Sequence, residues 1–213
     1  MTVGVIGWKK NEVLCMKILV TAFDPFGGES LNPAQLAVEK LPDLIGGHTI
    51  VKMIVPTVFG VSGDLVVAKM DEIRPDAVVC IGQAGTRLAI TPERVAINIM
   101  DATIADNAGF IPQDVPVIPD GPAAYFSTLP VKAMTAAINA ADIPGKISNT
   151  AGTFVCNQLL YRVLHHAAAN HPACGCCFIH VPYIPAQVTD KPGVFAMGLE
   201  DIVRGLTAAI ESI

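Results

Sequence analysis

The chain has 213 residues and a formal net charge of −5, a length that fits one domain with a large core. Charged residues make up only 15% and hydrophobic residues 52%, against roughly 25% charged in an average globular chain, so we expect buried contacts between subunits as well as a core. The negative charge disfavours nucleic acid or an anionic membrane as a partner. No apolar run reaches the roughly 18 residues that would span a bilayer.

Residues 1–15 show no periodicity that matches the chain after them, and a buried strand begins just beyond Met16. Their lysines follow the apolar residues, which is the reverse of a secretory signal. We therefore interpret 1–15 as an N-terminal extension outside the fold and 16–213 as a single domain. The six cysteines lack the spacing of a disulfide framework, so we expect a reducing, cytoplasmic location.

The first half of the chain alternates strand and helix patterns. Asn32 and Pro33 are typical of a helix cap and a first helical position. The pattern predicts strands at 18–22, 49–55, 77–81 and 94–99, and helices at 33–41 and 61–73. Many Pro, Gly and Asp residues in 101–122 predict a long excursion shaped as a loose hairpin.

The second half continues the alternation, with strands predicted at 146–149 and 177–181 and helices at 131–141, 157–170 and 199–213. Such alternation predicts an α/β fold, a three-layer α/β/α sandwich around a largely parallel, mixed sheet. Ligands of such folds bind where the carboxyl ends of the strands meet. The candidate loops are therefore 23–28, 82–93, 150–156 and 180–185.

Cys156 follows a strand-like run and a turn of small residues, and an apolar helical pattern begins directly after it. It is expected at or just before the first turn of a helix, with Asn157 as a plausible cap. Free N–H groups and the positive end of a helix stabilise a thiolate, so Cys156 is a candidate nucleophile. The alternative is an inert core cysteine, because free cysteines are among the most buried residues.

His180 lies at the end of an apolar strand that Pro182 terminates. A histidine there is often a core residue, yet a Cys–His pair is the minimal apparatus of a thiol hydrolase. Glu93, just before an apolar run, could orient the imidazole. Its alternative is an exposed pair with Arg94, which would contribute little stability.

Phe23 and Phe26 flank a turn before two glycines, and they could form a flat apolar slot or simply pack beneath the loop. The phosphate-loop pattern with its lysine is absent. A zinc site built from Cys174, Cys176 and Cys177 with His171 and His180 is disfavoured, because the spacing matches no standard zinc motif. We expect no metal.

Three blocks of the sequence together resemble a known family. They are residues 16–28 followed by Asn32-Pro33, residues 82–85 followed by 90–98, and residues 148–157 followed by 180–182. In order and spacing these blocks resemble pyroglutamyl peptidase I, also called pyrrolidone-carboxylate peptidase, a cysteine peptidase. The resemblance covers about residues 16–213.

The resemblance implies a phosphorylase/hydrolase-like fold and a catalytic triad of Glu93, Cys156 and His180. It implies a thioester acyl-enzyme, pyroglutamyl peptides as substrates, no cofactor, and a cytosolic homotetramer. The substrate pocket that it implies uses Phe23, Phe26, Asn32, Gln83, Phe154 and Val155.

Two features depart from the family pattern: residues 1–15 precede its usual start, and Thr103 stands where members often carry arginine. If that arginine assists binding, affinity or rate would be reduced here. Two alternatives remain open from the sequence. A nucleoside phosphorylase would need a basic phosphate pocket, for which we find no pattern, and a non-catalytic binding protein would have kept the fold without an activated cysteine.

Overall fold

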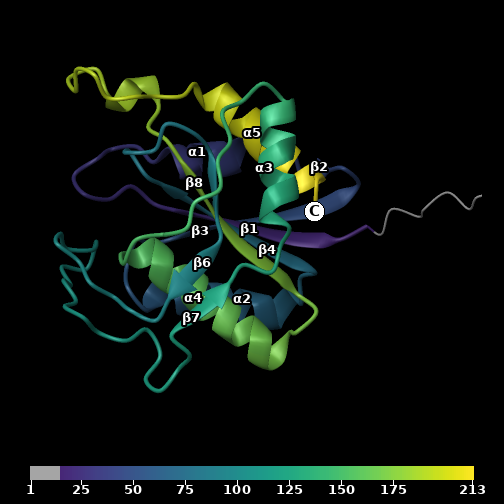
Figure 1. Cartoon of the computed structure of the whole chain (residues 1–213), viewed down its shortest axis with the longest axis vertical. Coiled ribbons are helices and arrows are strands. Elements are labelled where there is room, and N and C mark those ends of the chain that lie inside the picture. The colour runs from purple at the N-terminus through teal and green to yellow at the C-terminus, as the bar shows by residue number, and fades with distance from the viewer. Residues whose placement is uncertain (1–14) are drawn as a thin grey trace, which may run out of the picture.

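A six-stranded mixed sheet forms the centre of the molecule (Figure 1). The structure, a computed structural model, describes residues 15–213, so nearly all of the predicted N-terminal extension lies outside the described part. The strands lie in the order β2 (Leu44–Ile45), β3 (His48–Val55), β1 (Lys17–Phe23), β4 (Ala77–Gln83), β8 (Gly175–Val181) and β5 (Thr91–Glu93). The strands β3, β1, β4 and β8 are parallel, while β2 and β5 pair antiparallel at the two edges. The predicted three-layer α/β fold is confirmed.

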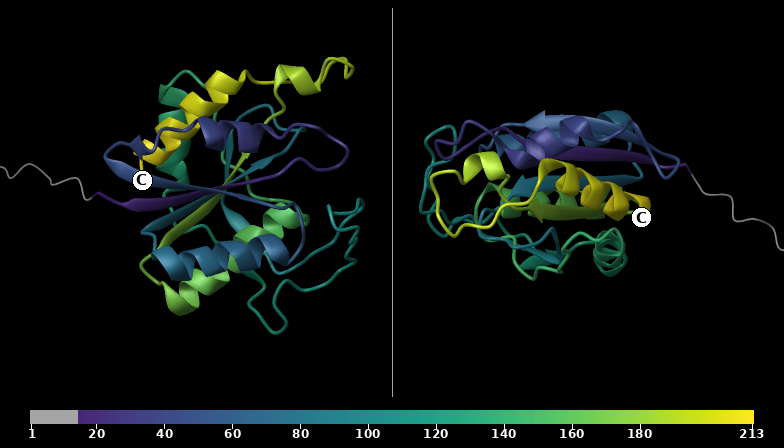
Figure 2. Two further views of the ribbon diagram at one scale, coloured as in Figure 1. Left: turned by 180° about the vertical axis from the view of Figure 1, so that it is seen from behind. Right: turned by 90° about the horizontal axis from the view of Figure 1, so that it is seen from above.

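Helices cover both faces of the sheet (Figure 2). On one face lie α1 (Pro33–Lys40), α3 (Val131–Ala140) and α5 (Leu199–Glu211), and on the other lie α2 (Val61–Ile73) and α4 (Val155–Asn170). A short ribbon of β6 (Val95–Ile97) and β7 (Ala124–Phe126) packs beside α4, and a 3-10 turn, η1 (Pro185–Gln187), follows β8.

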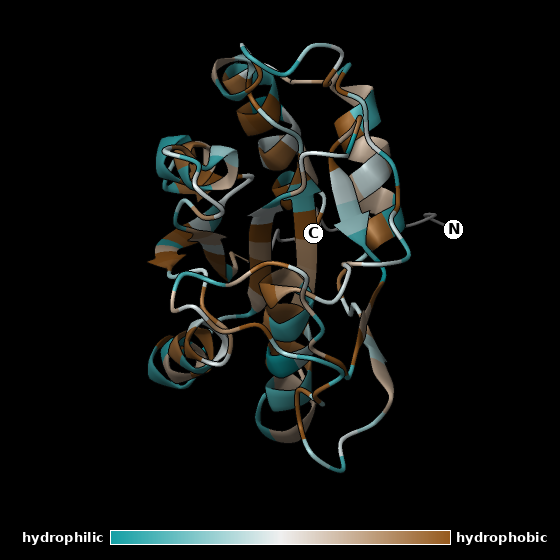
Figure 3. Cartoon of the chain, turned by 90° about the vertical axis from the view of Figure 1, so that its left-hand side faces the viewer, coloured by the Kyte–Doolittle hydropathy of each residue, from teal (hydrophilic) through white to brown (hydrophobic). Residues whose placement is uncertain are grey.

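Period-two alternation along each strand divides the core between the two faces. In β1, Ile18 and Val20 join the core beneath α1, α3 and α5, whereas Leu19 and Phe23 join the core beneath α2 and α4. The sheet is correspondingly apolar, while the helices carry polar residues on their outer sides (Figure 3). Each fully buried side chain of this size stabilises the fold by roughly 1.5–3 kcal/mol.

Most predicted helices and strands agree with the observed bounds within two residues, but two predictions are wrong. Residues 146–149 form no regular strand and make only one isolated bridge, between Ser148 and Glu93. The predicted strand 94–99 is confirmed as the shorter β6, and a separate strand that was not predicted, β5, ends just before Arg94. Asn157 is not a helix cap, because α4 begins at Val155 and Phe154 is its N-cap residue.

The predicted loose hairpin is an irregular segment with one antiparallel bridge, between Met100 and Val115. The buried carboxylate of Asp106 holds this segment in place by accepting hydrogen bonds from the backbone N–H groups of Phe59, Ala108 and Phe110. Of the helices in residues 15–213, none combines the length and the apolar character that a bilayer crossing requires.

Candidate active site

The loops that follow β1 and β4 meet the start of α4 and the end of β8 around one cavity of about 300 Å³. This is the carboxyl edge of the parallel strands, where α/β proteins bind ligands. The residues that line the cavity are Phe26, Gln83, Ala84, Thr86, Arg87, Thr150, Ala151, Gly152, Phe154, Cys156 and His180. All four candidate loops contribute to it, and so does a thiol together with an imidazole.

Cys156 lies in the first turn of α4 and is partly exposed to the cavity. No side chain caps the N-terminus of this helix, so the first-turn N–H groups are not satisfied by a capping side chain. The Sγ atom approaches the backbone of Gly82 so closely that a Cβ at Gly82 would lie 3.1 Å from Sγ and 2.6 Å from the Phe178 ring. Gly82 pairs with His180 of the neighbouring strand. A glycine is therefore needed where the thiol lies against the sheet beside the histidine.

Burial, and to a smaller extent the nearby charge of Glu93, raises the pKa of the Cys156 thiol to about 12. A backbone hydrogen bond acts in the opposite direction but does not prevail. Desolvation thus opposes the stabilisation of a thiolate that the helix start was expected to give. A thiol whose pKa is raised needs a base to become a nucleophile.

His180 and Glu93 form a buried pair, with Nδ1 of the ring 2.7 Å from Oε1 of the carboxylate. Glu93 has no exposed surface and His180 is only 4% exposed. A carboxylate only accepts hydrogen bonds, so Nδ1 carries the proton and donates it, which leaves the Nε2 lone pair free. The Phe178 ring, 4.7 Å from the imidazole centroid, packs against the ring. The arrangement holds one tautomer of His180 in one orientation.

Arg87 is the partner of Glu93, and Arg94 is not. The Nη2 atom of Arg87 lies 3.2 Å from Glu93 Oε1, 3.0 Å from Ser148 Oγ and 2.8 Å from the Thr150 carbonyl oxygen. The guanidinium thus compensates the buried carboxylate and ties it to the turn that precedes Cys156. The sequence-based alternative of an exposed Glu93 is wrong, and Arg87 was missed because a loop arginine is usually solvated.

The turn between Ser148 and Cys156 is held by its own polar groups. Ser148 Oγ donates to the Thr150 carbonyl at 3.0 Å, and Thr153 Oγ1 donates to the Asp101 carbonyl at 2.7 Å. Gly152 has φ +75°, a conformation that costs glycine little and other residues more. The turn therefore reaches the helix start with a fixed path along the cavity wall.

The structure divides the predicted pocket residues into two groups. Phe26, Gln83 and Phe154 line the cavity, and the rings of Phe26 and Phe154 lie 6.0 Å apart. Phe23, Asn32 and Val155 are buried and lie outside the cavity-lining set. They act from behind it: Phe23 packs on Phe178, Asn32 caps α1 and binds the Asp24 carbonyl, and Val155 fills the core.

The alternatives considered from the sequence find little support in the geometry. Arg87 is the only lysine or arginine among the described residues that line this cavity, and it is already paired, so a phosphate would find no free cation. The thiols of Cys174 and Cys176 are 4.0 Å apart, but His180 pairs with Glu93 and His171 with Asp71. Thr103 is exposed and does not line the cavity.

A second cavity of about 350 Å³ lies between α2, α4 and the irregular segment, lined by residues such as Phe59, Asp64 and Arg162. No cysteine or histidine is among its described lining residues. The thiol and imidazole chemistry therefore belongs to the cavity beside Cys156.

Known proteins resemble this chain along most of its length. A family model described as pyroglutamyl peptidase matches residues 16–213. A pyrrolidone-carboxylate peptidase of Levilactobacillus brevis is 53% identical over 198 residues, which cover 93% of this chain and 97% of that protein. One from Streptococcus pyogenes is 55% identical over 198 residues, covering 93% and 92%.

Solved structures give the same picture. Pyroglutamyl peptidase I of Bacillus amyloliquefaciens has a TM-score of 0.90 at 42% identity, covering 92% of this chain and 96% of that one. A pyrrolidone carboxyl peptidase variant of Pyrococcus furiosus has a TM-score of 0.88 at 40% identity, covering 92% and 97%.

Proposed function

The chain belongs to the pyroglutamyl peptidase family, and from this premise we propose that it removes an N-terminal pyroglutamyl (5-oxoproline) residue from peptides, with Cys156, His180 and Glu93 as its catalytic triad. The observation that carries the triad is one cavity lined by both the thiol and an imidazole whose Nδ1 is held 2.7 Å from a buried carboxylate. Residues 16–213 form the catalytic domain in this proposal.

The substrate ends in a neutral five-membered lactam, so recognition cannot use an ammonium group. The rings of Phe26 and Phe154 supply apolar walls for it, and backbone groups near Gln83 supply polar contacts. The Gln83 side-chain oxygen already accepts from Gln187 Nε2 at 2.9 Å, which supports a role for the backbone. A ring without the lactam carbonyl would leave such a group unpaired, at a cost of about 1–3 kcal/mol.

In the first half-reaction, Cys156 Sγ attacks the carbonyl carbon that follows the lactam ring. His180 Nε2 takes the thiol proton as the C–S bond forms, because a thiol with a pKa of about 12 is not ionised beforehand. The uncapped N–H groups at the start of α4 face the negative oxygen of the tetrahedral intermediate. Loss of such a donor costs roughly 10²–10³ in rate in other enzymes.

The intermediate then collapses. The C–N bond breaks, and Nε2 delivers its proton to the departing peptide amine, which leaves a pyroglutamyl thioester on Cys156. In the second half-reaction, His180 takes a proton from water, the resulting hydroxide attacks the thioester carbonyl, and the C–S bond breaks. The sulfur regains the proton and pyroglutamate leaves. Glu93 holds the tautomer of His180 throughout and stabilises the imidazolium, while Arg87 positions Glu93.

We place the enzyme in a reducing compartment, the cytoplasm, because all six cysteines are free in the described residues. We also propose a homotetramer. Large apolar side chains are exposed in and beside the irregular segment, and subunit contacts would cover them; they include Ile104 (50% exposed), Phe110 (48%) and Phe126 (69%). Light scattering of the purified chain tests the assembly.

The activity is tested by hydrolysis of a chromogenic pyroglutamyl amide. We expect turnover by the intact chain, no measurable turnover by Cys156→Ser, and full turnover by Cys15→Ser, which changes an exposed thiol away from the cavity. Circular dichroism should show the same fold for all three proteins. Undiminished turnover by Cys156→Ser would refute the nucleophile, and a prolyl amide cleaved as fast as the pyroglutamyl amide would refute the substrate class.

A further inference from the structure

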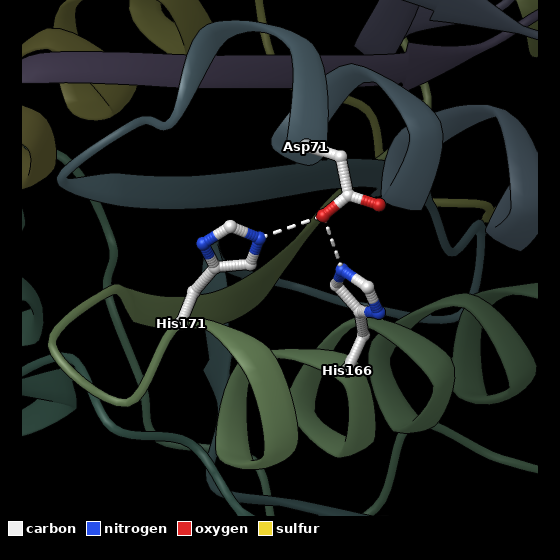
Figure 4. A group of neighbouring side chains, drawn as sticks. All are labelled: Asp71, His166 and His171. Carbon is white, nitrogen blue, oxygen red and sulfur yellow. Dashed lines mark hydrogen bonds and ion pairs between the residues drawn. The ribbon is translucent and has the colours of Figure 1, made fainter.

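A second histidine–carboxylate cluster lies at the other end of α4 (Figure 4). Asp71 comes from the last turns of α2, His166 from the last turns of α4, and His171 follows directly as its C-cap residue. One oxygen, Asp71 Oδ1, lies 2.9 Å from His166 Nε2 and 2.7 Å from His171 Nε2. The three potential ligand atoms all lie within 4.8 Å of one another.

The cluster is accessible but ordered by its surroundings. The side chains of His166 and His171 are only 14% and 12% exposed, whereas that of Asp71 is 55% exposed. Contact with the two histidines lowers the pKa of Asp71, His171 having the larger effect. The carboxylate is therefore ionised at neutral pH, and it faces solvent from which an ion can arrive.

The donor set has the chemistry of a particular class of ion. Two imidazoles and one carboxylate suit Zn²⁺ and neighbouring divalent transition metals, whereas Mg²⁺ and Ca²⁺ prefer oxygen ligands alone. Tetrahedral Zn²⁺ with bonds of about 2.0–2.1 Å needs ligand atoms roughly 3.3 Å apart. The observed contacts of 2.7 and 2.9 Å need only a small outward movement, and a water completes the shell.

Asn170 supplies the outer contact that such sites commonly have. Its side-chain amide lies 3.2 Å from Nδ1 of His166. When His166 Nε2 binds a metal, the ring proton must move to Nδ1, and rotation of the Asn170 amide then presents its oxygen to that N–H. Outer-shell partners of this kind fix the ring and raise the affinity for metal.

We propose that Asp71, His166 and His171 form a binding site for one divalent transition-metal ion of the Zn²⁺ class. The ion cross-links α2 to the turn between α4 and β8. His166 follows Cys156 by ten residues on one helix, about 15 Å at 1.5 Å per residue, so the ion does not touch the reacting atoms. Its role is structural, and it resists separation of the two helices that cover this face of the sheet.

The test uses the full reduced chain and Co²⁺ as a spectroscopic substitute for Zn²⁺. The thiols of Cys156 and the Cys174–Cys176 pair could also bind metal, but their thiolates would produce a charge-transfer band in the near ultraviolet. We expect one equivalent of Co²⁺ to give visible d–d absorption without that band. Zn²⁺ should displace it and raise the midpoint of thermal unfolding, since a ligand that binds only the native state stabilises it.

Variants separate this site from the rest of the chain. Asp71→Ala and His171→Ala should abolish the thiolate-free absorption, and Asn170→Ala should weaken Co²⁺ binding by about tenfold. His165→Ala is the matched control, because that neighbouring histidine contacts Tyr125 instead, and it should leave Co²⁺ binding intact. Three results would each overturn the proposal: no thiolate-free absorption in the intact chain, its persistence in His171→Ala, or its equal loss in His165→Ala. Circular dichroism of each variant separates loss of the site from loss of the fold.

Discussion

Two histidine–carboxylate sites with contacts of similar length lie in very different surroundings. The His180–Glu93 contact of 2.7 Å is buried, with Glu93 fully covered and His180 only 4% exposed. The contacts of His166 and His171 with Asp71, at 2.9 and 2.7 Å, share a carboxylate that is 55% exposed. Distance alone therefore does not separate the two sites.

Burial and further partners decide what each pair can do. Around His180, the Phe178 ring and the Arg87 guanidinium leave one ring orientation and one acceptor, as proton transfer to and from a substrate requires. Around Asp71, water and ions compete for the same oxygen and screen the attraction. The buried pair is suited to positioning a proton, and the exposed cluster to binding an ion.

Removing His180 should have the largest effect on kcat. In His180→Ala, kcat should fall by about 10³-fold or more, because no other group in the triad can accept the proton of a thiol whose pKa is raised. Steady-state kinetics with a pyroglutamyl amide measure the loss. His165→Ala, on α4 but outside the cavity, should keep its kcat; a similar fall in both variants would count against a specific role for His180.

Neutralising Glu93 should have the next largest effect. Glu93→Gln keeps the shape but can donate to Nδ1, which favours the tautomer with Nε2 protonated, so kcat should fall by about 10²–10⁴-fold. Circular dichroism should show an intact fold. The exposed Glu39 provides the matched control, Glu39→Gln. If Glu93→Gln turned over at the normal rate, Glu93 would be a structural residue only.

Arg87 should matter less, because it acts through Glu93 and through the turn before Cys156. Hydrogen bonds to charged groups contribute about 1.5–3 kcal/mol, so Arg87→Gln should lower kcat by roughly tenfold to a hundredfold with little change in KM. Arg87→Lys should recover only part, since one ammonium cannot reproduce the planar guanidinium. Arg94→Gln is the control; equal losses in Arg87→Gln and Arg94→Gln would remove the distinction between the two arginines.

Buried and exposed thiols should also differ, in how they change stability with pH, and this is the smallest effect that we expect. Burial raises the pKa of Cys80 to about 12, so the folded thiol stays neutral while the unfolded one ionises. The contribution of this raised pKa to the free energy of unfolding is complete below pH 9. It is lost as the pH rises toward 12, by about 1.4 kcal/mol per pH unit. Urea unfolding at several pH values should show less alkaline loss in Cys80→Ala than in the exposed control Cys15→Ala. Parallel pH profiles would contradict it.

Local patterns predicted much of the fold. The Asn32 cap and the proline after it predict the start of α1, and helical periodicity predicts α2 with its observed bounds. Residues 146–149 were wrongly predicted as a strand because their composition is strand-like, while their pairing with β5 is limited to one isolated bridge, between Ser148 and Glu93. Asn157 has the composition of a cap but bridges the backbone of Ile97 and Ile99 instead.

The site was less predictable, because its contacts join distant segments. A well-placed cysteine and a histidine at a strand end could be identified from local pattern and family resemblance. The burial of Glu93 could not be predicted from local pattern, since its partners Arg87 and His180 are fixed only by the fold. The same holds for the raised pKa of Cys156, which depends on burial, and for the Asp71 cluster, which joins two helices.

The central claim is that Cys156 carries the acyl group during turnover. The most direct measurement mixes the enzyme with excess pyroglutamyl amide, quenches the reaction in acid within milliseconds, and maps the digested chain by mass spectrometry. We expect a pyroglutamyl thioester on the peptide containing Cys156, which appears before steady state and is absent in Cys156→Ser. An adduct on another residue would contradict it, as would turnover with no adduct even when the second half-reaction is slowed at low pH.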